Sequence, residues 1–78
     1  MDNERRIEME TNEKQISRNI KACRNRTGKS QKKIAEELNI TKATYSNIEN
    51  NPLRYSIKKL NAIAKNLHCN IDEFFLKR

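Results

Sequence analysis

The sequence has little of the residues that form turns, rigid cross-links and aromatic cores. Its 78 residues include one glycine, one proline and no tryptophan, and aromatic residues make up only 5%. So few turn residues argue against a fold of many strands, because each hairpin needs its own turn. The sequence also lacks a run of about 18 apolar residues, the length that a membrane-spanning helix needs. We therefore expect a mainly helical chain that does not cross a membrane.

Cysteine and histidine are equally sparse. Cys23 and Cys69 form no CxxC motif, and His68 is the single histidine. This spacing excludes the usual zinc sites and disulfide frameworks, so both cysteines are interpreted as small core residues in a reducing compartment. The polar, acidic N-terminus is unlike a signal peptide. We expect a cytoplasmic protein without a metal, cofactor or small-molecule ligand.

Positive charge is plentiful but unevenly distributed. Lys and Arg number 17 against 10 Asp and Glu, a net charge of +7. Residues 1–14 hold five acids and three bases, whereas residues 15–78 hold 14 bases and five acids. We therefore divide the chain into a flexible polar tail (1–14) and a folded basic domain (15–78), with a helical extension into the tail as the alternative. A basic domain attracts polyanions, of which DNA is the commonest, although a solvated lysine-rich surface is also compatible with this charge.

Apolar residues recur every three or four positions, which predicts helices. Five short helices are expected, at 15–27, 30–38, 41–50, 56–67 and 70–77. Their boundaries are marked by N-cap side chains and by residues that accept a left-handed backbone, namely Ser30, Thr41, Ser56, Asn70, Gly28 and Asn39. The inward apolar positions are Ile16, Ile20, Cys23, Ile34, Ala35, Leu38, Ile40, Tyr45, Ile48, Ile57, Leu60, Ile63, Ala64, Leu67 and Phe74.

Two of these helices are joined by a turn of only three residues, 39–41. Both are too short to be stable alone, so tertiary contacts must hold them. The second helix leaves an outward face without any acid, made of Lys42, Ala43, Thr44, Ser46 and Asn47. A helix pair with such a face is typical of a helix-turn-helix that places its second helix in the major groove of DNA.

At this point the sequence resembles the helix-turn-helix domain of the lambda-type repressors and Cro proteins, the XRE group. The similarity covers about residues 15–76 and rests on Ile20, Arg24, Ser30, Gln31, Ile34, Ala35, Leu38, Ile40, Thr41, Tyr45, Ile48, Glu49, Leu60, Ile63, Ala64, Leu67 and Phe74. The resemblance implies an all-α, compact five-helix lambda-repressor-like domain. It also implies a sequence-specific regulator of transcription that binds a palindromic operator in double-stranded DNA as a homodimer, and we expect it to act as a repressor. Asn39 and Asn51 stand where the family often has glycine, and Tyr45 is bulkier than the usual residue.

The resemblance also assigns roles to individual residues. It matches Lys42, Ala43 and Asn47 to positions that face bases, with Thr44 and Ser46 beside them. It matches Gln31 to a contact with the DNA backbone and Arg24 with Glu49 to a partly buried salt bridge. From their chemistry and position we add Lys29, Ser30, Lys32 and Arg54 as backbone contacts, the Tyr45 hydroxyl as a further group able to reach a phosphate, and Phe75 with Leu76 as a dimer contact.

Two other classes of function stay open. The same helices in a protein-interaction module, or in an antitoxin that pairs with a toxin, would give a similar pattern. An acid-free outward face favours DNA over these, because an interaction module would tolerate acids there. An enzyme is the weakest alternative, since the sequence shows neither a carboxylate pair nor a histidine beside a nucleophile.

Overall fold

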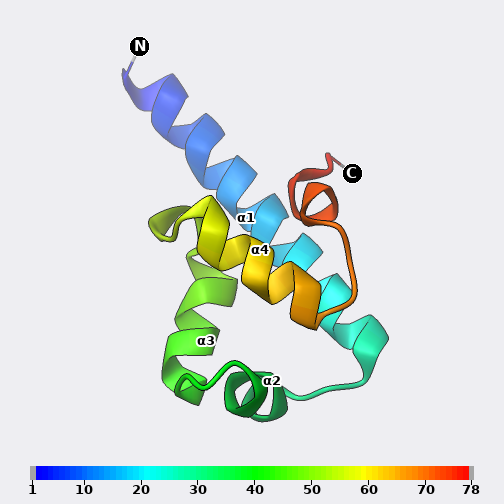
Figure 1. The fold of residues 1–78 in the computed structure, drawn as a ribbon. Coiled ribbons are helices and arrows are strands. Elements are labelled where there is room, and N and C mark those ends of the chain that lie inside the picture. The colour runs from blue at the N-terminus through cyan, green and yellow to red at the C-terminus, as the bar shows by residue number, and fades with distance from the viewer. Residues whose placement is uncertain (1, 78) are drawn as a thin grey trace.

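Four α-helices make up most of the computed structural model, which describes residues 2–77, with side chains from residue 12 onward (Figure 1). They are α1 (Asp2–Thr27), α2 (Gln31–Glu37), α3 (Lys42–Asn50) and α4 (Ile57–Asn66). Two short 3₁₀ helices, η1 (Pro52–Arg54) and η2 (Ile71–Phe75), follow α3 and α4. No strand occurs between residues 2 and 77, so the predicted all-α fold is correct. The fifth predicted helix forms only as the 3₁₀ helix η2.

Helix α1 is longer than the predicted first helix. It begins at Asp2, so the backbone of residues 2–14 is helical, which was the alternative interpretation of this segment. Figure 1 shows this N-terminal part extending beyond the other helices. Met1 and the side chains of residues 2–11 lie outside the described part of the chain. The division into a flexible tail and a domain at residue 14 stays a prediction.

The helix starts are fixed by side chains, as the sequence predicts. The N-cap hydroxyls of Ser30, Thr41 and Ser56 accept hydrogen bonds of 3.0–3.1 Å from the backbone N–H groups of Lys33, Thr44 and Lys59. At η2, the Asn70 side chain accepts from the Asp72 N–H, and the Glu73 carboxylate accepts from the Asn70 N–H. Each bond satisfies a backbone donor that the helix itself leaves unpaired.

Left-handed backbone marks two turns that the sequence identified and one that it did not. Gly28 has a φ of 73° and Asn39 a φ of 59°. His68, directly after the C-cap of α4, has a φ of 56°, and histidine is among the non-glycine residues that are enriched in this conformation. Asn51, which can also take positive φ, instead has a φ of −132°.

The core lies between all four α-helices and η2. Most of the predicted inward side chains are buried in it, with Leu38 and Ile40 packed partly buried at its edge. Ile57 is the exception, because its side chain is 63% exposed and its predicted core position is wrong. It is the first residue of α4, one turn before the buried Leu60, where no described element covers the helix.

A buried asparagine ties the C-terminal segment to this core. The side-chain N–H groups of Asn19 donate to the backbone carbonyls of Phe74 at 3.0 Å and Leu76 at 2.8 Å. Phe74 is fully buried, whereas Phe75 and Leu76 are 40% and 47% exposed. Helix α1 therefore positions the segment that ends the fold.

Candidate nucleic-acid interface

Helix α3 presents the predicted outward face to solvent. Tyr45 and Ile48 are buried on one side, while Lys42, Ala43 and Asn47 are exposed on the other. The only acid of α3, Glu49, is fully buried. The exposed surface of this helix is therefore neutral to positive, as binding to a polyanion requires.

Two of the predicted base-contacting residues are less available. Thr44 and Ser46 are half-buried. The Thr44 hydroxyl accepts a hydrogen bond from the Thr41 hydroxyl at 2.9 Å, and the Ser46 hydroxyl accepts one from the Asn50 amide at 3.3 Å. Their side chains are thus held at the borders of the outward face.

A buried ion pair fixes this helix against its neighbours. Arg24 donates to both carboxylate oxygens of Glu49, with Nε–Oε2 at 2.9 Å and Nη2–Oε1 at 3.2 Å. The Glu49 side chain has 0% exposure and that of Arg24 has 18%. Hydrogen bonding to Glu49 raises the pKa of Arg24, so the guanidinium stays charged. The pair that the resemblance implied is present, and its bidentate contact links α1 to α3.

Gln31 joins the same cluster at the start of α2. Its Nε2 donates to Glu49 Oε1 at 3.0 Å. A side-chain amide carries two N–H donors, so one is left for a phosphate. The structure thus brings Arg24, Gln31 and Glu49, from three different helices, into one hydrogen-bonded group beneath the outward face.

The other residues predicted to contact the DNA backbone differ in whether their side chains already have a partner within the protein. Lys32 and Arg54 are exposed and belong to no ion pair among the described residues. Lys29 is paired with Glu37 at 2.8 Å, and the Ser30 hydroxyl serves as the cap of α2. A phosphate would therefore have to displace Glu37 to reach Lys29.

The predicted role of the Tyr45 hydroxyl is wrong. Tyr45 is fully buried, so its hydroxyl cannot reach a phosphate. The oxygen has no hydrogen-bond partner of acceptable geometry, although it lies beside the Arg24–Glu49 pair. Burial and the nearby Glu49 charge raise the pKa of this phenol, which therefore stays protonated.

One further contact from α1, made by Ser17, was not predicted from the sequence. The Ser17 hydroxyl is buried and donates to the backbone carbonyl of Glu49 at 2.6 Å. Its position one residue after the core residue Ile16 was the available signal. This bond satisfies a carbonyl in the last turn of α3 and adds a second link between α1 and α3.

One group of side chains has the composition of a metal site. The ligand atoms of Cys23, Cys69 and Glu73 lie within 4.8 Å of one another. The Arg26 guanidinium already donates to the Cys23 sulfur at 3.1 Å and to Glu73 at 3.0 Å. Burial, with the adjacent Cys23, raises the pKa of Cys69 to about 12, which keeps the thiol protonated. The Cys69 thiol is neutral, and the Arg26 guanidinium already occupies the group. These side chains therefore fit a structural link between α1 and η2 better than a metal centre.

Exposed apolar side chains of η1 and of the C-terminal segment gather beside α1. Phe75 and Leu76 border a hollow of about 290 Å³ together with Leu53 of η1 and Ile16 of α1. Its remaining lining residues are Asn12, Gln15 and Lys77. Together these residues form a mostly apolar surface on which two predicted dimer contacts lie side by side.

Two short helices at a tight turn, with a solvent-facing second helix, define a DNA-binding helix-turn-helix domain. A model of the helix-turn-helix family matches residues 20–74, and the chain belongs to this family, of Cro/C1 type in the XRE group. It is thus a DNA-binding regulator, and the family is one of DNA-binding domains rather than of enzymes. No curated protein and no solved structure matches the chain significantly. Among the described residues, no helix has both the length and the apolar character to cross a membrane.

Proposed function

We propose that this protein represses transcription by placing α3 in the major groove of an operator. The observation that carries this proposal is the outward face of α3, where Lys42, Ala43 and Asn47 are exposed and no acid is present. The N–H donors of Lys42 fit the N7 and O6 acceptors of guanine, and the Asn47 amide fits adenine N6 and N7. Ala43 offers a methyl group to thymine, and Thr44 and Ser46 border these contacts.

A second group of residues holds the DNA backbone and reads no sequence. Gln31 keeps one amide N–H for a phosphate, and Lys32 and Arg54 are exposed cations. Lys29 and Ser30 stand at the start of α2, where Lys29 exchanges Glu37 for a phosphate. These contacts fix the register of α3 on the duplex.

The regulator acts as a homodimer on a palindromic operator. Phe75 and Leu76 border an apolar hollow that a second copy would cover. On an operator whose half-sites are one turn of DNA apart, the two α3 helices of the dimer would lie about 34 Å apart. Occupation of such a site at a promoter blocks polymerase by position.

Selection of binding sites from random duplexes tests the proposal directly. We expect a palindromic sequence with half-sites about one helical turn apart. On that sequence, Asn47→Ala should lower the preference for one base pair of each half-site by roughly tenfold. Lys32→Ala is the matched control, because it should weaken every duplex alike and reduce the salt dependence. Failure to select any sequence would refute operator reading and favour an interaction module or antitoxin.

Dimerisation is tested separately. Phe75→Glu with Leu76→Glu places charges on side chains that are already exposed, so the fold should survive. Light scattering should then report a monomer, and operator binding should weaken more than binding to a single half-site. A wild-type protein that remains monomeric at high concentration and on the operator would contradict the homodimer.

A further inference from the structure

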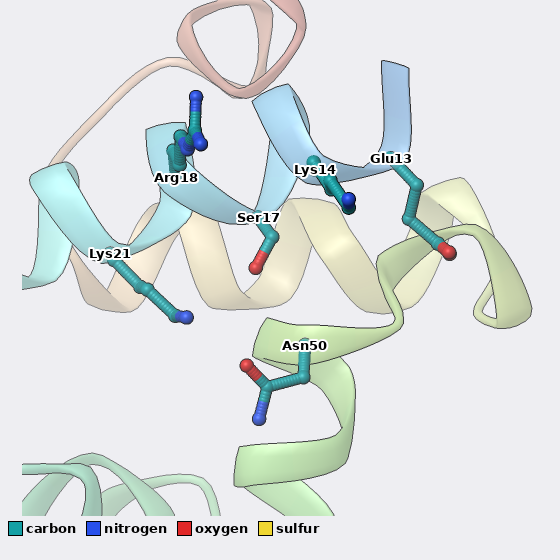
Figure 2. A pocket seen from close by; sticks show the side chains of 6 residues that line it. All are labelled: Glu13, Lys14, Ser17, Arg18, Lys21 and Asn50. Carbon is teal, nitrogen blue, oxygen red and sulfur yellow. The ribbon is translucent and has the colours of Figure 1, made fainter. Parts of the chain in front are cut away.

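Helix α1 carries a row of positive side chains beside the end of α3. Lys14, Arg18 and Lys21 line a hollow of about 370 Å³ with Ser17, Glu13 and Asn50. Figure 2 shows Lys21 pointing toward Asn50 and the tip of Lys14 lying between Ser17 and Glu13, whereas Arg18 points away from Asn50. Lys14 and Lys21 lie seven residues apart, which is two helical turns and about 10 Å along the axis. This distance is close to the rise of three nucleotides on one DNA strand, at about 3.4 Å each.

Lys14 and Lys21 form no ion pair within the described part of the protein. The ion pairs found there use Arg24, Arg26 and Lys29 and leave out Lys14 and Lys21. The only acid in the hollow is Glu13, whose carboxylate accepts the Leu53 backbone N–H at 3.2 Å and is thereby directed toward η1. The hollow therefore has a surplus of positive charge open to solvent.

The hollow continues the outward face of α3. Asn50 is exposed and lies three residues after Asn47 on the same side of the helix, and its amide donates to Ser46. The Ser17 bond to the Glu49 carbonyl and the Arg24–Glu49 pair hold α1 rigidly against this part of α3. A ligand that occupies the outward face therefore extends onto α1 without any rearrangement of the protein.

We propose that Lys14 and Lys21 bind phosphates about three nucleotides apart on the DNA strand that borders the groove occupied by α3. This inference rests on the proposed function, because α3 must first enter the groove. The partner follows from the chemistry, since spaced ammonium groups beside a base-reading face fit a regular row of phosphates. These contacts carry no sequence information and add to the affinity for every duplex.

The test compares the wild-type chain with Lys14→Ala/Lys21→Ala on the selected operator and on a scrambled duplex, each over a range of salt concentrations. Lys65→Ala is the matched control, because Lys65 is an exposed lysine in the last turn of α4. We expect the double variant to bind both duplexes about tenfold more weakly, with the slope of log affinity against log salt reduced by about 2. The variant Lys14→Arg/Lys21→Arg keeps both positive charges and should bind like wild type. That result would show that the alanine variant loses affinity through lost charge rather than through misfolding.

The outcomes separate this inference from the proposed function. If wild type selects no sequence, the proposed function fails. If wild type reads its operator but the double variant keeps the wild-type salt slope, as Lys65→Ala should, the phosphate contacts of α1 are refuted while operator reading stands. A loss confined to the operator would also overturn the inference, because phosphate contacts affect both duplexes alike.

Discussion

Replacement of Arg24 by methionine should be one of the most destabilising single changes in this domain. It leaves the Glu49 carboxylate, which has 0% exposure, with the single side-chain hydrogen bond from Gln31 at 3.0 Å. Breaking a buried pair by removing one partner costs about 3–5 kcal/mol, and the remaining amide bond offsets part of it. We therefore expect a loss of about 3 kcal/mol at neutral pH, or about 12–24 °C in Tm for a domain of this size.

Urea unfolding followed by circular dichroism gives the measurement, and two further variants test the reasoning. Glu49→Gln should cost about 1–2 kcal/mol, because Arg24 is 18% exposed and its charge can reach water. The double variant Arg24→Met/Glu49→Met should be more stable than Arg24→Met alone, since no charge is left buried. An Arg24→Met protein within about 0.5 kcal/mol of wild type, or a double variant no more stable than the single one, would refute the argument.

Three smaller predictions follow from single groups. Tyr45→Phe removes a buried hydroxyl without a partner and should leave stability unchanged or raise it by up to about 1 kcal/mol, so a clear loss in urea unfolding would show that the hydroxyl is bonded after all. Asn39→Ala should lose about 1–2 kcal/mol because of its φ of 59°, whereas Asn39→Gly should be close to wild type, and equal losses for both would exclude backbone strain as the cause. Glu37 has its pKa lowered by Lys29 and then Asn66, so its contribution is present above the ordinary carboxyl pKa and is lost as the pH falls through the lowered value. The stability difference between wild type and Glu37→Gln should accordingly be present at neutral pH and decrease as the pH falls below the ordinary carboxyl pKa, and a difference independent of pH would contradict it.

The local elements of the fold could be predicted because their causes are local. An N-cap such as Ser30 acts on a backbone group three residues away, and Asn39 takes its left-handed backbone from its own side chain and position in the turn. The helix-turn-helix and the outward face of α3 follow from apolar spacing over a few turns. The Arg24–Glu49 pair joins distant positions, and it was expected only because the sequence resembles a family in which those positions meet.

Errors and omissions occurred where contacts span the chain. Ser17 meets the Glu49 carbonyl 32 residues later, and Asn19 meets the Phe74 and Leu76 carbonyls 55 and 57 residues later. Apolar periodicity predicts that Ile57 faces the core, but it cannot show that no described element covers the first turn of α4. The same limit applies to the Tyr45 hydroxyl and to the lysines of α1 beside Asn50. Between residues 15 and 67 the sequence determined which segments are helical and which face of each is mainly apolar. Only tertiary packing decided which faces meet, because burial depends on partners far away along the chain.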